Sequence, residues 1–262
     1  MRAAAFPPSG RPNCSRTRPS KTVCWTNWWP SYWKRGTRVW TWILSTSPGR
    51  TGRLFLAFLG NARDRLHQVG LSLHVDLAPK THPDQEGLLY EGHDYGAVGA
   101  IADSILLMTY EWGYAYGPPM AVAPLPQVEQ VVRYAVTEIP PGKIQLGIPN
   151  YGYDWTLPHT PGRRAVTLGN QEAVRLAAQV GAEISFDETA QTPTFSYTKE
   201  GEAHRVWFED ARSVQAKLRL ALEWKLGGVA YWNLLRPFAQ NWAILGETIW
   251  PDQGSAGERL PW

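Results

Sequence analysis

The sequence predicts an α/β fold of parallel βα units that carries a small α+β insertion toward its C-terminal end. Two observations predict this. Short apolar runs alternate with segments of helical period over residues 55–249, as parallel βα units require. Between residues 156 and 209 that rhythm gives way to short alternating strands. The 262 residues are 44% hydrophobic, which is enough for a sizeable core.

The elements before the insertion follow from apolar periodicity. A helix is expected from Phe55 to Val69, because apolar residues recur there at helical spacing and Gly70 ends the run. The elements expected next are a strand at 71–78, a weak helix or loop at 93–102, a strand at 103–109, a helix at 127–136 and a strand at 144–148.

The insertion is expected to hold one helix and three short strands. They are a helix at 171–180 and strands at 184–187, 194–197 and 204–208, the last two joined by a turn at 199–201. The βα pattern then resumes. Asp210 is expected to cap a helix that runs to about Trp224, before a strand at 227–232 and a helix at 238–249. The tail, residues 251–262, is expected to fray.

The charge is unevenly distributed along the chain. Residues 1–63 contain eleven Arg or Lys and no Asp or Glu. The whole chain has 26 basic and 23 acidic residues, so the remainder carries 15 basic against 23 acidic residues, a net charge of −8. An acidic folded part argues against nucleic acid as a partner.

Several other site classes are excluded by the sequence. Both cysteines, Cys14 and Cys24, precede the periodic part, which therefore has no thiol for catalysis or a disulfide. No apolar run is long enough to span a membrane, and the start of the chain lacks a secretory signal. His74, His82 and His93 lack metal-ligand spacing, so we expect neither a metal nor a cofactor.

Three predicted strand ends carry the same kind of side chains. They are Tyr110-Glu111-Trp112, Tyr151 to Trp155 with Tyr153 and Asp154, and Tyr231-Trp232-Asn233. The carboxyl ends of parallel strands meet on one rim, where α/β barrels hold their active sites. Indole and phenol rings stack on sugar faces, while carboxylates and amides bind hydroxyls. One such group alone would indicate core packing, but three on one rim favour a carbohydrate site.

Several motifs in order resemble glycoside hydrolase family 18, in particular its spore-cortex peptidoglycan hydrolases. The resemblance covers roughly Phe55 to Ile249 and is carried by Leu77–Thr81, Met108–Glu111, Gly117–Ala121, Leu146–Trp155, Val206–Ser213 and Gly228–Trp232. It implies a (β/α)8 barrel that retains the anomeric configuration while cleaving β-1,4 bonds beside N-acetylglucosamine. In this substrate-assisted scheme, the acetamido oxygen of the sugar attacks its own anomeric carbon.

The resemblance also implies roles for single residues. Tyr110 matches the tyrosine that hydrogen-bonds the acetamido oxygen during catalysis. Glu111 stands where the family usually has Asp, which leaves its catalytic role open. The residues that the resemblance assigns to substrate binding are Met108 beneath the pocket, Trp232 as the aromatic floor, and Tyr151 and Asp154 in the wall.

The family's catalytic motif is missing from its expected place. In the family, an Asp-x-Asp-x-Glu motif ends the fourth strand, where the Glu protonates the leaving oxygen and an Asp orients the acetamido N–H. Residues 37–46 occupy that place and contain no acid. Loss of a general acid lowers the rate by roughly 10²–10⁴-fold, so the chain is expected to be inactive as written. Asp76 and Glu111 are the remaining candidate acids, although Asp76 is better interpreted as a buried hydrogen-bonding group.

Residues 1–53 look non-native and are expected to be either out of frame or disordered. They are rich in Trp and basic residues and show no sustained period. Because Trp has the single codon TGG, Trp40-Thr41-Trp42-Ile43 is encoded TGG-ACN-TGG-ATH. Read two bases later, this gives GAC-NTG-GAT, or Asp-x-Asp. The shifted frame can therefore encode the missing motif.

On this basis we expect a truncated barrel that contains about strands 5–8, with the insertion between strands 7 and 8. An incomplete barrel exposes a strand edge and an apolar face, so the chain should be marginally stable and, if folded, monomeric. Its expected partner is an N-acetylglucosamine-containing polysaccharide. The alternative is a non-catalytic carbohydrate-binding or spore-coat interaction protein. The family implies the spore cortex, the coat or secretion as the location.

Overall fold

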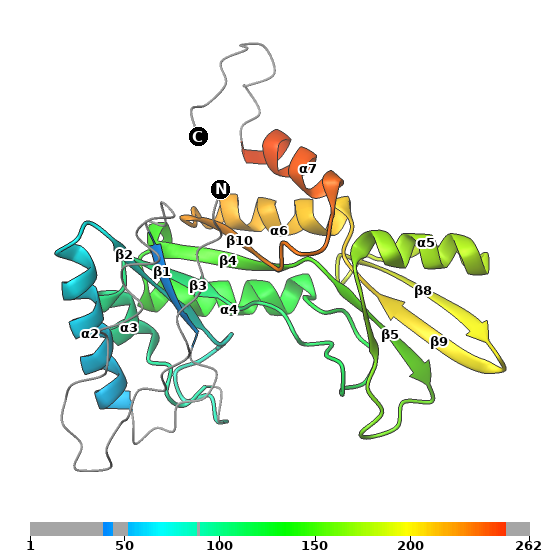
Figure 1. The fold of residues 1–262 in the computed structure, drawn as a ribbon, viewed down its shortest axis with the longest axis horizontal. Helices are drawn as coiled ribbons and strands as arrows, with labels where there is room; N and C mark the ends of the chain where they lie inside the picture. Colours follow the sequence, from blue (N-terminus) through cyan, green and yellow to red (C-terminus); the bar gives the residue numbers. More distant parts are fainter. Residues whose placement is uncertain (1–38, 44–51, 88–89, 250–262) are drawn as a thin grey trace, which may run out of the picture. The chain divides into compact units, whose positions relative to one another are not determined.

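The computed structural model describes residues 39–43, 52–87 and 90–249 (Figure 1). The expectations for the tail at 251–262 and for most of residues 1–53 lie outside this part of the chain.

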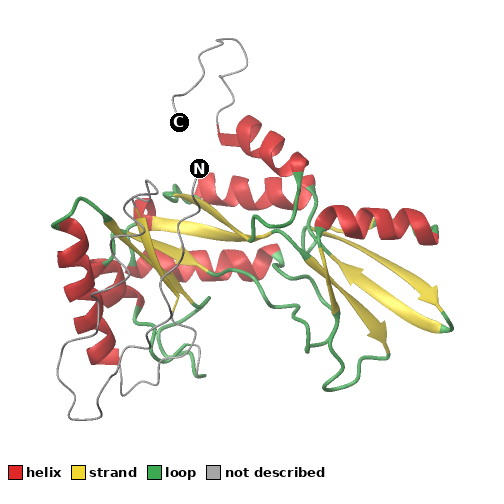
Figure 2. Cartoon of the chain, viewed as in Figure 1, coloured by secondary structure: helices red, strands yellow, loops and turns green. Residues whose placement is uncertain are grey.

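The first sheet has five parallel strands in the order β1-β2-β3-β4-β10. Its strands alternate with helices along the chain (Figure 2), which confirms the predicted α/β class. Among the described residues, β1 and β10 form the two edges of this sheet. The strands are β1 (Val39–Ile43), β2 (Ser72–Leu77), β3 (Ser104–Leu107), β4 (Ile144–Pro149) and β10 (Gly228–Trp232), and the helices are α2 (Gly52–His67), α3 (Tyr95–Ile101), α4 (Leu125–Glu138), η2 (Pro141–Lys143), α6 (Ala211–Glu223) and α7 (Ala239–Ile249).

The two faces of this sheet differ in burial because side chains alternate along each strand. One face packs against helices: Leu146 contacts α4 and α6 side chains, and Ile148 contacts Val214 and Leu218 of α6. On the opposite face, Asp76, Leu106 and Gln145 are neighbours in register. Asp76 is buried, while Leu106 and Gln145 are only half-buried. The described core therefore lies on the helix side of the sheet.

The second sheet is antiparallel and is inserted between β4 and β10. Its strand order is β6-β5-β9-β8-β7, and helix α5 packs on it through Ala173 and Ala177, which contact Phe195. The turn between β8 and β9 has positive φ at Glu200 and Gly201, as a tight hairpin requires. Its elements are β5 (Gly152–Leu157), β6 (Val166–Leu168), α5 (Asn170–Val180), β7 (Ser185–Asp187), β8 (Thr192–Lys199) and β9 (Glu202–Trp207).

The second sheet begins at Gly152, whereas the sequence pattern predicts an insertion that starts at residue 156 and a strand end before it. Residues 153–157 pair with β9, and Tyr153 and Trp155 lie on one face of β5. Period-2 alternation of aromatic residues is the signal for this strand. The same aromatic residues also suit a rim of strand ends, which is why the sequence pattern does not predict β5.

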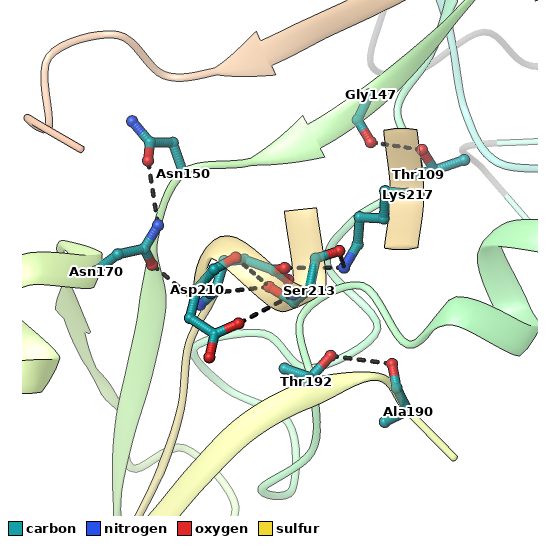
Figure 3. A network of polar contacts seen from close by, with 10 residues as sticks. Thr109, Gly147, Asn150, Asn170, Ala190, Thr192, Asp210, Ser213 and Lys217 are labelled. Carbon is teal, nitrogen blue, oxygen red and sulfur yellow. Dashed lines mark hydrogen bonds and ion pairs between the residues drawn. The ribbon is translucent and has the colours of Figure 1, made fainter. Parts of the chain in front are cut away.

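A buried chain of amides fixes the ends of the insertion. Asn150 follows β4 and donates from Nδ2 to the carbonyls of Asn233 (3.1 Å) and Arg236 (2.8 Å), which follow β10. Its Oδ1 accepts from Nδ2 of Asn170 at the start of α5 (3.1 Å; Figure 3). In turn, Asn170 Oδ1 accepts from the backbone N–H of Glu209 (3.0 Å). The amide chain therefore links both ends of the insertion to the loop after β10.

Helix α6 is anchored by a fully buried ion pair. Lys217 Nζ lies 2.8 Å from Glu209 Oε2, and neither side chain is exposed to solvent. Asp210 caps the helix as predicted, because its Oδ1 accepts from the backbone N–H of Ser213 (3.0 Å; Figure 3). Burial raises the pKa of Glu209, while Lys217 opposes that shift. The carboxylate therefore depends on its lysine partner.

Replacement of this lysine should strongly destabilise the fold. Lys217→Met leaves the Glu209 carboxyl buried without a counter-charge, so the free energy of unfolding should fall by about 3–5 kcal/mol. Denaturant unfolding measures this, with Arg212→Met as the matched control, since Arg212 forms a solvent-exposed pair with Asp210. Equal, small losses in both variants would contradict a structural role for the buried pair.

Candidate functional site

The end of β3 is held between β2 and β4 and positions the predicted catalytic segment. The backbone N–H of Met108 donates to Leu77 O (3.0 Å), and Thr109 Oγ1 donates to Gly147 O (2.7 Å). Gly147 lies under the ring of Tyr110: a Cβ atom at this position would collide with Leu107 O and lie 3.0 Å from Tyr110 Cε1. Glycine at this position therefore allows the Tyr110 ring to lie against β4.

Two buried phenols hold the carboxylate of Glu111. The hydroxyls of Tyr151 and Tyr153 both donate to Glu111 Oε1, the second at 2.9 Å. Glu111 itself is exposed and has a φ of 71°, which non-glycine residues rarely adopt. The loop that follows is closed by backbone hydrogen bonds from Trp112 to Val122 and from Gly113 to Ala121. Side-chain and backbone contacts together maintain this strained conformation.

The phenols around Glu111 remain protonated at neutral pH. Burial, followed by the charge of Glu111 and the hydrogen bond to it, raises the pKa of Tyr151 and of Tyr153. Burial raises the pKa of Tyr110 as well, and the charges of Asp76 and Glu111 add to this shift. The hydroxyls of Tyr151 and Tyr153 therefore donate to Glu111, and that of Tyr110 can donate to a ligand, as binding of a sugar's acetamido oxygen requires.

Asp76 is a buried carboxyl on the same side of the first sheet as the candidate site. Its side chain is 4% exposed, and its Oδ1 has no hydrogen-bond partner among the described residues. Burial raises its pKa to about 7. Its charge also contributes to the raised pKa of Tyr110. The residue is buried as expected, and near neutral pH a large fraction of it carries a proton.

Trp232 lies at the end of β10, in register with Pro149 at the end of β4. Its side chain is 49% exposed. Its carbonyl accepts from the backbone N–H of Asn150 (2.7 Å), so the backbone of this residue is fixed while the ring remains accessible. Met108 is half-buried just after β3. An accessible ring on a fixed backbone is suited to stacking on a sugar face.

Asp154 belongs to a different cluster from the other predicted site residues. It accepts a hydrogen bond from Tyr197 Oη (2.6 Å), and its Oδ1 lies 3.0 Å from His204 Nδ1. Successive side chains on a strand point to opposite faces, so Tyr153 contacts Glu111 while Asp154 does not. Tyr153 has the contact expected of a site residue, and the Tyr-x-Tyr alternation in the sequence is the signal that identifies it.

No group of three or more His, Cys, Asp or Glu residues in the described part of the chain could hold a metal ion. No described helix is both long and apolar enough to cross a membrane.

Tyrosines, a carboxylate and an exposed tryptophan thus lie at the strand ends of a parallel βα sheet. Residues 33–236 match the family model "Glycosyl hydrolases family 18", and the chain belongs to that family. Its fold is of the TIM-barrel type that this family shares. The predicted family resemblance is confirmed.

Two of the relatives are named as cortex-lytic enzymes of Bacillus species. The chain is 51% identical to the cortical fragment-lytic enzyme of Bacillus subtilis (strain 168) over 192 residues. The aligned region covers 72% of this chain and 44% of that protein. The spore cortex-lytic enzyme SleL of Bacillus megaterium QM B1551 superposes with a TM-score of 0.79 at 44% identity, over 83% of this chain and 50% of that one.

A more distant relative is the chitinase of Chromobacterium violaceum ATCC 12472, with a TM-score of 0.77 at 30% identity over 84% of this chain and 68% of that one. The chain spans about half the length of the cortical fragment-lytic enzymes that it matches.

The raised pKa of Asp76 predicts a pH-dependent stability. The folded state binds the Asp76 proton more tightly than the unfolded state, whose pKa is near 3.8, so this contribution is complete below pH 4 and is lost as pH rises through about 7. Relative to wild type, Asp76→Asn should gain on the order of 4 kcal/mol in unfolding free energy between pH 4 and pH 8.

Denaturant unfolding of both proteins across this pH range checks the prediction. Asp84→Asn, a substitution at an exposed position, is the control and should follow wild type at every pH. A constant difference between Asp76→Asn and wild type would show that Asp76 titrates normally.

Proposed function

We propose that this chain carries the substrate-binding half of a family 18 glycosidase site, which binds β-1,4-linked glycans containing N-acetylglucosamine, as in cortex peptidoglycan or chitin. The observation that carries this proposal is the convergence of Tyr151 and Tyr153 on Glu111, beside Tyr110. In substrate-assisted hydrolysis the nucleophile is the acetamido oxygen of the sugar. The protein must orient that group and protonate the leaving oxygen.

The described residues are suited to orienting the acetamido group of the sugar. Tyr110 is a protonated phenol that can donate to the acetamido oxygen, and Glu111 is a fixed acceptor suited to the acetamido N–H or a sugar hydroxyl. Trp232 offers an exposed ring on which the reacting sugar can stack, with Met108 nearby at the end of β3. These contacts hold the sugar in a reactive geometry.

The glutamate that protonates the leaving oxygen in this family is absent from its usual place. Residues 37–46 stand where the family carries Asp-x-Asp-x-Glu, and they contain no acid. We therefore propose a glycosidase by ancestry that is inactive as written. A non-catalytic glycan-binding role is the alternative that this missing acid favours.

The arrangement of the first sheet also supports an incomplete barrel. We propose that β1, β2, β3, β4 and β10 correspond to barrel strands four to eight, with the insertion between strands seven and eight. The sheet order and the half-buried face of Leu106 and Gln145 support an incomplete barrel, because a closed barrel would bury that face. Such a chain should be monomeric and only marginally stable.

A binding assay tests the proposed site. By isothermal titration calorimetry, the full chain should bind the N-acetylglucosamine tetramer, and Trp232→Ala should weaken binding by about tenfold because the stacking surface is lost. Trp242→Ala is the matched control, since Trp242 is 51% exposed and lies on α7. No reducing ends should be released. Unchanged binding by Trp232→Ala would contradict the site, and clear turnover would contradict the inactivity.

A nucleotide sequence tests the origin of the missing motif. We propose that residues up to about Leu54 are translated out of frame, because the codons of Trp40 to Ile43 encode Asp-x-Asp two bases later. The locus should contain a one- or two-base insertion or deletion near the Leu54 codon, and a protein with the frame corrected should release reducing ends from the tetramer. An open frame at this locus without a nearby one- or two-base insertion or deletion would refute this explanation.

A further inference from the structure

Asp76 is a buried carboxyl to which the proposed binding site assigns no role. The side chain is 4% exposed, and Oδ1 has no hydrogen-bond partner among the described residues. The residues in register with Asp76 are Ile43 of β1 and Leu106 of β3, and neither carries a titratable group. A charge on a buried carboxyl is costly unless a neighbouring group compensates it, so the donors near Asp76 decide what this residue does.

Tyr110 lies on the same face of the first sheet as Asp76. Side chains in register on neighbouring strands point to one face, which places Asp76, Leu106 and Gln145 in one row. Gly147 is two residues beyond Gln145 on β4 and so belongs to the same face. A Cβ atom at Gly147 would lie 3.0 Å from Tyr110 Cε1. The Tyr110 ring therefore lies on the face that carries Asp76, nearer the strand ends.

The charge of Asp76 acts on the Tyr110 hydroxyl. Burial is the main cause of the raised pKa of Tyr110, the charge of Asp76 comes second, and the charge of Glu111 comes third. Glu111 is the next residue in the chain, and electrostatic interactions weaken with distance, so the Asp76 carboxylate must also lie near this hydroxyl. An ionised Asp76 attracts the hydroxyl proton and repels an acceptor oxygen placed beside it. A protonated Asp76 does neither.

Asp76 changes its charge in the neutral range. Burial raises its pKa to about 7. Tyr110 stays protonated in this range because its pKa is raised. His74 lies two residues earlier on the same face of β2, and burial lowers its pKa, so it is mostly uncharged in the same range. Asp76 is therefore a group on this face whose charge responds to pH near neutrality.

We propose that Asp76 is a positioning residue that acts through Tyr110 and makes the binding of N-acetylglucosamine glycans depend on pH. Its protonated carboxyl leaves the Tyr110 hydroxyl available to the acetamido oxygen, whereas its carboxylate competes for that hydroxyl. The inference rests on the proposed function, because it takes Tyr110 as the acetamido-binding group. Binding is tight in mildly acidic solution and weak in mildly alkaline solution. Since binding and protonation are linked, sugar binding near neutral pH takes up part of a proton.

Titration calorimetry of the full chain with the N-acetylglucosamine tetramer tests this in two ways. The affinity of wild type should fall about fivefold from roughly pH 5.5 to roughly pH 8.5, because a charge appears close to the bound acetamido group. Near neutral pH, the binding enthalpy should differ between phosphate and Tris buffers, which have different heats of ionisation. Asp76→Asn should bind like wild type in acidic solution and show neither the fall nor the buffer dependence.

The control is Asp84→Asn, which removes an exposed carboxylate and should retain both effects. Unfolding curves establish that each variant is folded, and proton uptake is measured on wild type itself. If Asp76→Asn keeps the fall in affinity, or if wild type shows no fall and no buffer dependence, Asp76 does not act on the site, while the proposed function stands. If wild type does not bind the tetramer at any pH, the proposed function and this inference are both wrong.

Discussion

The hydrogen bonds from Tyr151 and Tyr153 to Glu111 are the contact on which the rest of the site depends. Glu111 belongs to the loop after β3, and the two tyrosines frame the start of β5. One carboxylate oxygen thus joins the parallel sheet to the antiparallel insertion. Because the phenols are buried and uncharged, the interaction is stronger than it would be in water. It also stabilises the unusual backbone conformation of Glu111.

The insertion is also held at both of its ends by buried polar groups. The Asn150–Asn170 amide bond and the Glu209–Lys217 ion pair lie where the chain enters and leaves the second sheet. Such groups stabilise the fold only when they are satisfied together, so they restrict how the insertion can be oriented on the barrel strands. That restriction keeps Tyr153 in register with Trp207, where Tyr153 can donate to Glu111.

Much of the fold could be predicted from local periodicity. The helix that ends before Gly70, the cap at Asp210 and the buried strand before Thr109 each have a local sequence signal, and each is present. Strand β5 was missed because its aromatic residues suit both a rim and a strand. Deciding between these alternatives requires knowledge of β9, its partner nearly fifty residues later.

The candidate site could be predicted in part, because strand ends are visible in the sequence while the face to which each side chain points is not. Tyr110, Glu111 and Tyr151 follow buried strands and meet as expected, whereas Asp154 points to the opposite face of β5 and pairs with His204. Alternation along a strand distinguishes Tyr153 from Asp154 only once the strand itself is known.

We propose that a family 18 substrate site survives at these strand ends without its usual proton donor. A crystal structure of the full chain with the N-acetylglucosamine tetramer tests this proposal most directly. One sugar should stack on Trp232, with its acetamido oxygen hydrogen-bonded to Tyr110 and its bonds intact. A tetramer bound away from Tyr110 and Trp232, or cleaved in the crystal, would contradict it.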